Sequence, residues 1–182
     1  MSRLIPLLAL LILPACESGP YPVNSPYYQI PTGSRIMVKQ ELTIPANQAR
    51  INLQYGRPVT PNELDQYHAH CWFLSWKRLE KSQTIIPDTF VITRVQHLEE
   101  VVLKQGGLLL ASNSKLGFSG INSSPTAVEY KTEMTIKSEK QPDIRQLVCN
   151  HWEDPIDARH LTVPEIGATL GNYAELRLKS SP

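Results

Sequence analysis

The stretch AVEYKTEMTIKS, residues 127–138, has the clearest secondary-structure pattern in the chain. Its apolar or small side chains alternate with charged and polar ones at every second position. A period of two is typical of a β-strand with one buried and one solvated face. Sheets with one wet face are commonly antiparallel. The buried set is Val128, Tyr130, Thr132, Met134 and Ile136, and the wet set is Glu129, Lys131, Glu133, Thr135 and Lys137.

Other segments carry strand patterns of the same kind, and the first two are joined by Pro45-Ala46-Asn47-Gln48, which predicts a hairpin. A helix running through residues 64–79 is an alternative to one strand, but its aromatic and β-branched content favours the strand. A long loop is expected between residues 112 and 126. The expected strands are 35–44, 49–55, 69–79, 89–103, 107–112, 127–138, 143–152 and 174–179.

Two short helices are expected, each from a capping-box spacing. Thr60 and Glu63, with Pro61 between them, predict one or two turns ending near Tyr67. Thr162 and Glu165 predict a helix within 161–173, and a glycine at position 171 suits its end. The fold class is therefore mainly β, an antiparallel barrel or sandwich of about eight strands with two short helices.

The N-terminal segment has the pattern of a targeting signal. It begins MSRLIPLLALLILPAC, with one positive charge at Arg3 and an apolar run too short to span a bilayer. The sequence Leu13-Pro14-Ala15-Cys16 resembles a bacterial lipobox, and the chain resembles small, uncharacterised envelope lipoproteins of Gram-negative bacteria. The resemblance implies cleavage before Cys16, lipidation of its thiol and anchoring in a membrane.

Three domains follow from this interpretation: a signal peptide (1–15), a proline-rich tether (16–32) and one β-rich domain (33–182). Glu17 rather than aspartate after the lipidated cysteine implies, by the same resemblance, the outer membrane with the domain facing the periplasm. The tether could instead pack on the domain as an ordered arm. The chain has 18 basic and 17 acidic residues, so it lacks the basic footprint of a nucleic-acid partner.

Lipidation of Cys16 would leave Cys71 and Cys149 as one pair in a compartment that oxidises thiols. We therefore expect a disulfide between them, worth about 4 kcal/mol in the loop-entropy estimate.

The stretch QYHAHCWFLSW, residues 66–76, supplies the candidate ligand or partner face. On a strand His68, His70, Trp72 and Trp76 share one face, while Cys71 points to the other. Imidazole and thiolate groups suit zinc or copper, and the sequence offers them at His68, His70, Cys71, Cys149 and His151. The strand geometry, however, keeps these side chains apart. No metal site is predicted; a smaller site of His68, His70 and a carboxylate is an alternative, as are solvated surface histidines.

The sequence contains none of the common catalytic motifs. The adjacent acids Glu99–Glu100 and Glu153–Asp154 are interpreted as solvated pairs. We therefore expect no enzyme and no cofactor, but a lipid-anchored periplasmic module that binds another envelope protein as a structural or accessory component. Alternative hypotheses are a carrier of a small apolar ligand lined by Trp72 and Trp76, and a metal-binding protein that uses His68 and His70.

Overall fold

The protein is described by a computed structural model, which defines residues 21–102, 127–156 and 159–179. Within these residues the chain is mainly β, as expected, with one helix. The elements are β1 (Arg35–Val38), β2 (Leu42–Ile44), β3 (Arg50–Gln54), β4 (Arg57–Val59), β5 (His70–Ser75), β6 (Gln83–Ile85), β7 (Asp88–Val102), β8 (Ala127–Lys137), β9 (Ile144–Glu153), α1 (Val163–Leu170) and β10 (Ala174–Arg177).

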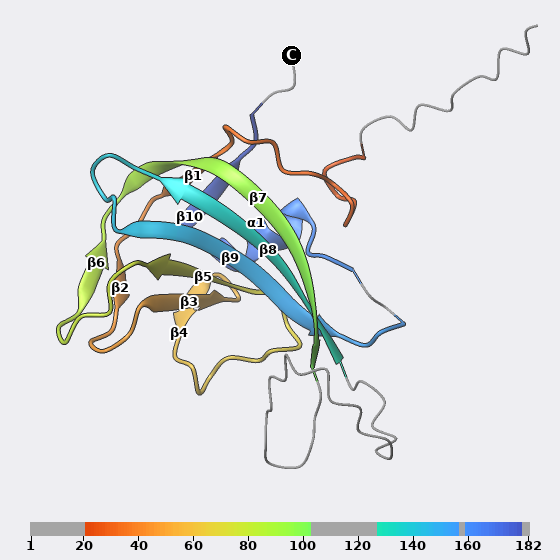
Figure 1. Ribbon diagram of the computed structural model, residues 1–182, viewed down its shortest axis with the longest axis horizontal. Helices are drawn as coiled ribbons and strands as arrows, with labels where there is room; N and C mark the ends of the chain where they lie inside the picture. Colours follow the sequence, from red (N-terminus) through yellow and green to blue (C-terminus); the bar gives the residue numbers. More distant parts are fainter. Residues whose placement is uncertain (1–20, 103–126, 157–158, 180–182) are drawn as a thin grey trace, which may run out of the picture.

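Eight of these strands form one open, curled sheet in the order β10-β1-β7-β8-β9-β5-β3-β4, and β2 pairs with β6 in a small second sheet (Figure 1). All pairings are antiparallel. Helix α1 contacts β10 at one edge of the curl and β5 and β3 near the other edge. The helix therefore lies inside the curl, and the architecture is a half-barrel rather than a closed barrel or a sandwich.

The pattern in residues 127–138 is confirmed by β8 from Tyr130 to Ile136, where the predicted core face is buried. At the start of the strand Ala127 is buried and Val128 only half-buried, opposite to the prediction. The concave face of the half-barrel is filled by large side chains that are almost fully buried, and Ile166 and Leu170 of α1 close it. The sheet's contributions include Phe73, Phe90, Ile92, Met134 and Leu147.

The strands expected at 89–103, 143–152 and 174–179 are confirmed as β7, β9 and β10, and the second helix is confirmed as α1. Its capping box is present: Glu165 N donates to Thr162 Oγ1 at 3.4 Å, and Thr162 N donates to Glu165 Oε2 at 2.8 Å. The strand expected at 107–112 and the loop at 112–126 lie outside the described residues.

The helix expected at 60–67 is wrong, although its capping contact forms, with Thr60 N donating to Glu63 Oε2 at 2.8 Å. The reason is competition from Gln54 of β3. Its Nε2 donates to the carbonyl oxygens of Asp65 and His68, and its Oε1 accepts from Asp65 N. Asp65 N, which a helix would have paired with the Pro61 carbonyl, is thus hydrogen-bonded to the sheet instead.

The single strand and the hairpin expected in residues 35–55 are also corrected. Residues 35–44 form two strands in different sheets, and β2 pairs with β6, not with β3. Asn47 has a φ of 60°, and its N–H donates to the Leu79 carbonyl at 2.7 Å. The turn is thereby tied to a distant segment. The short strands β4 and β6 were not predicted.

Part of the predicted tether packs on the domain. Residues 21–32 form no helix or strand, but Ile30 is buried in the core and Tyr28 packs against it. No helix in the described ranges is long and apolar enough to cross a membrane.

Candidate functional site

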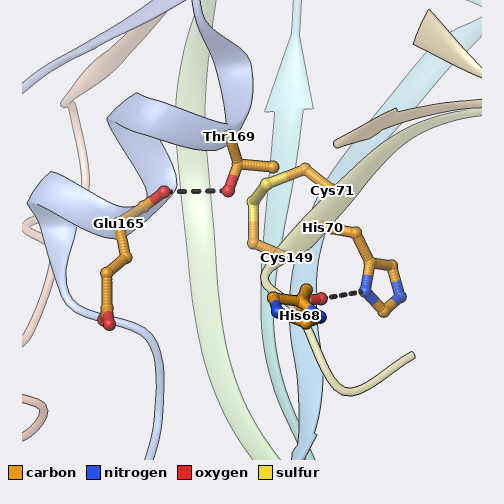
Figure 2. The surroundings of a disulfide bond; sticks show 6 residues. All are labelled: His68, His70, Cys71, Cys149, Glu165 and Thr169. Atoms are coloured by element: carbon orange, nitrogen blue, oxygen red, sulfur yellow. Dashed lines mark hydrogen bonds between the residues drawn. A yellow bond between two sulfur atoms is a disulfide. The ribbon is translucent and has the colours of Figure 1, made fainter. Parts of the chain in front are cut away.

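The predicted disulfide is present at the centre of the sheet. Cys71 of β5 and Cys149 of β9 are direct cross-strand partners with Cα atoms 4.0 Å apart, and both are fully buried. Their side chains project to the concave side, where Thr169 of α1 lies beside them (Figure 2). Thr169 Oγ1 donates to the Glu165 carbonyl at 2.8 Å. The bond therefore belongs to the core that holds the two sides of the curl together.

The two histidines of the predicted face lie in different environments. His68 precedes β5, is exposed, and has its Nδ1 2.8 Å from Asp65 Oδ2. His70 is 1% exposed, and its Nδ1 is 2.9 Å from the His68 carbonyl oxygen (Figure 2). Because that oxygen only accepts, Nδ1 of His70 carries the proton and Nε2 is left as a buried acceptor without a partner among the described residues. Burial also lowers the pKa of His70, so the ring is neutral at pH 7.

The two tryptophans are separated as well. Trp72 is half-buried on the convex face, stacked on the His70 ring at 5.9 Å and on the Arg50 guanidinium at 4.9 Å. Trp76 lies beyond β5, after a register shift between Leu74 and Ser75. The expected alternation over residues 68–76 is therefore interrupted at both ends. The four residues do not form one continuous surface.

Trp76 is the exposed tryptophan of the set, with 68% of its surface accessible. The Arg145 guanidinium lies 4.3 Å from its ring centroid. A mostly apolar hollow of about 230 Å³ adjoins the pair, lined by Trp76, Thr135, Ile136, Lys137, Ser138, Pro142, Ile144 and Arg145. Among the described side chains, neither Lys137 nor Arg145 has an ion-pair partner. We call this surface the Trp76 platform.

A second group of side chains on the concave face was not predicted from the sequence. We call it the histidine cluster, and it consists of His97 (β7), Tyr130 (β8), His151 (β9) and His160, which precedes α1. The His160 ring centroid lies 4.7 Å from that of His97 and 5.3 Å from that of Tyr130, edge-on to the latter. The Tyr130 and His151 centroids are 6.2 Å apart.

The cluster is poor in hydrogen bonds. Both ring nitrogens of His151, Nδ1 of His160 and Oγ1 of the neighbouring Thr132 are buried without a hydrogen-bond partner among the described residues. His151 Nε2 is 3.4 Å from Glu153 Oε2, and His160 Nε2 is 3.7 Å from Glu99 Oε1. The first contact is too poorly aligned to be a hydrogen bond, and the second is too long.

Burial disfavours the charged form of all three imidazoles and lowers the pKa of His97 and of His151. The pKa of His160 falls to about 4, because of burial first and then the neighbouring His97 and His151. All three rings are consequently neutral at pH 7.

The sequence contained a weak signal for this cluster. Once β7, β8 and β9 are paired, the register places His97 opposite Thr132 and Tyr130 opposite His151. The register and the position of His160, however, follow from the curl of the whole sheet. Of its histidines, only His151 entered the metal-ligand set considered above. It lies on the concave face with Cys149, whereas His70 lies on the opposite face of the sheet. In the described part of the chain, no group of three or more His, Cys, Asp or Glu side chains is arranged to hold a metal ion.

Comparison of the chain with protein-family models, with curated proteins and with solved structures finds no match.

Proposed function

We propose that this protein is a lipid-anchored, non-catalytic binding module of the bacterial envelope, facing the periplasm from the outer membrane, that holds another envelope protein through the Trp76 platform. The observation that carries the proposal is the exposed Trp76 ring with Arg145 stacked on it beside an apolar hollow. The lipobox resemblance at Leu13–Cys16 supports the anchoring.

Tryptophan and arginine are the residue types most enriched among those that dominate protein–protein binding energy. Arg145 holds the indole in one orientation, so less side-chain entropy is lost when a partner covers it. An exposed indole in contact with an apolar hollow also offers surface whose burial is favourable.

The platform indicates the chemistry of its partner. Its lining includes two cations, Lys137 and Arg145, and no acid. A complementary surface would insert an apolar side chain into the hollow and place carboxylates beside the two cations. The packed concave face supports a protein partner over an enclosed small ligand, because the described core side chains there already fill the curl.

The test is photo-crosslinking in living cells with the full-length protein. A benzophenone amino acid replaces Trp76 in one variant and Tyr27 in the control, an aromatic residue that is comparably exposed at 64%. We expect one discrete protein adduct from position 76 and none from position 27. The adduct from position 76 should weaken at least tenfold when Arg145→Glu and Lys137→Glu reverse the charges, because two complementary pairs become repulsive.

Equal adducts from both positions, or none from position 76, would show that the platform is not the binding surface. Adducts that persist unchanged after the charge reversal would contradict the acidic chemistry assigned to the partner.

A further inference from the structure

Residues 159–162 form a short strap that crosses the concave face and leads into α1. At its start, Arg159 donates two hydrogen bonds to Glu165, from Nη1 at 2.8 Å and from Nη2 at 2.7 Å. In its middle, the His160 side chain is only 14% exposed and lies against His97 and Tyr130. Leu161 follows and is buried in the core. The strap is thus held to the sheet through His160 and Leu161.

The charged groups around the cluster come from four elements. Glu99 of β7 is 64% exposed and 3.7 Å from His160 Nε2. Glu153 of β9 lies 3.4 Å from His151 Nε2. Arg159 of the strap and Glu165 of α1 are committed to each other, and Glu165 also accepts from Thr162. The nearest residues of β8, Tyr130 and Thr132, are uncharged.

Among the described residues, none of these acids is hydrogen-bonded to His160. Glu153 is the acid nearest the cluster and favours a proton on His151, not on His160. Glu165 is already paired with Arg159, and Glu99 faces solvent, where its attraction for His160 is screened. A proton on His160 would therefore place a cation in a buried site, 4.7 Å from a second imidazole that also gains a proton in acid. Both effects destabilise the arrangement in which the strap lies on the sheet.

We infer that His97, His151 and His160 form an acid-sensitive latch, which holds the strap at residues 159–162 on the sheet at neutral pH and releases it on acidification. The inference does not depend on the Trp76 platform or on its partner. Release would expose Leu161 and the buried ring nitrogens of His151.

The size of the effect follows from proton linkage. With a pKa of about 4 when closed and an ordinary value of about 6.5 when open, His160 alone raises the opening equilibrium about 30-fold between pH 7.5 and pH 5. The direction of this pH dependence follows from the lowered pKa of His160 in the closed form. The open form binds the proton more tightly, so falling pH favours opening.

The test is hydrogen exchange of the full-length protein in detergent micelles, followed by mass spectrometry and corrected for intrinsic exchange rates. Peptides that cover residues 159–166 should lose about 30-fold in protection between pH 7.5 and pH 5, while peptides around Cys149 keep theirs. His160→Phe keeps an aromatic ring in the strap and removes its proton site, so this 30-fold component should disappear. His68→Gln, which changes an exposed histidine outside the cluster, should behave as the wild type.

Unchanged protection in the wild type, or the same pH dependence in His160→Phe, would overturn the latch. If His160→Phe does not fold, the titration of the His160 ring in the wild-type protein decides the matter by NMR. A midpoint near 6.5 would refute the inference, and one near 4 would support it.

Discussion

At the residue scale, one close backbone approach joins the end of α1 to the edge of the half-barrel. Gly171, which ends α1, has a φ of 55°, and Gly56, in the turn between β3 and β4, has a φ of 73°. A Cβ on Gly171 would lie 2.7 Å from the Gly56 carbonyl oxygen and even closer to its Cα. Gly56 N donates to the Thr169 carbonyl at 3.2 Å, so this contact ties the helix end to the sheet.

We therefore predict that Gly171→Ala lowers the free energy of unfolding by more than about 2 kcal/mol, through backbone strain and overlap with Gly56. Gly167→Ala in the same helix is the control, because nothing lies within 4 Å of its added Cβ. It should stabilise the protein by about 0.5–1 kcal/mol. Urea denaturation measures both changes. Equal effects of the two substitutions would mean that the approach of Gly56 is not tight in solution.

The sequence predicted only one of the two glycines in this contact. A glycine just after an amphipathic run with an N-terminal capping box predicts a helix end at Gly171. Nothing near Gly171 in the chain points to Gly56, because the two meet only when the sheet curls around α1. The predicted disulfide was accessible for a different reason: with three cysteines and one assigned to lipid, the pairing did not require knowledge of the register.

At the scale of secondary-structure elements, the chain uses the same capping box twice with different outcomes. In both, the threonine N–H donates to the glutamate carboxylate, but Glu165 N donates to the Thr162 hydroxyl whereas Glu63 N donates to the Thr60 carbonyl, and only the second box precedes a helix. The local signal was identical, and Gln54 decided the outcome at the first site by taking the backbone groups of Asp65 and His68. A competitor from a neighbouring strand cannot be recognised from the spacing of four residues.

This comparison yields a matched pair of variants. Thr162→Ala removes a side-chain acceptor for a backbone N–H at the start of α1 and should cost about 1 kcal/mol of unfolding free energy. Thr60 lies on an exposed turn whose backbone is held by Gln54. Thr60→Ala should therefore cost less than about 0.5 kcal/mol of unfolding free energy. Thermal or urea unfolding of the two proteins is the measurement. If Thr60→Ala lowers the unfolding free energy more than Thr162→Ala does, the Thr60 side chain stabilises the turn beyond what its hydrogen bonds to Gln54 explain.

At the scale of the whole molecule, the alternation of apolar and polar residues predicted the fold class correctly because burial on one face is a local property of each strand. Closure is a global property. Whether eight strands make a barrel, a sandwich or a half-barrel depends on how the sheet curls and on what fills it, here α1 lying between β10 and β5. The histidine cluster shares this limitation, since its members come from three strands and the strap.

The lipid anchor is the last prediction, and the three cysteines provide its test. In Cys16→Ser the thiol that would carry lipid is absent, so the protein should lose incorporated palmitate and leave the membrane fraction. The double variant Cys71→Ala/Cys149→Ala also removes cysteines but should stay membrane-bound, because the disulfide lies in the core and not at the anchor. Glu17→Asp should shift the protein from the outer to the inner membrane in a sucrose gradient. Cys16→Ser remaining in the membrane fraction would mean that something other than a lipidated Cys16 holds the domain there, and the proposed envelope module would then need a different attachment.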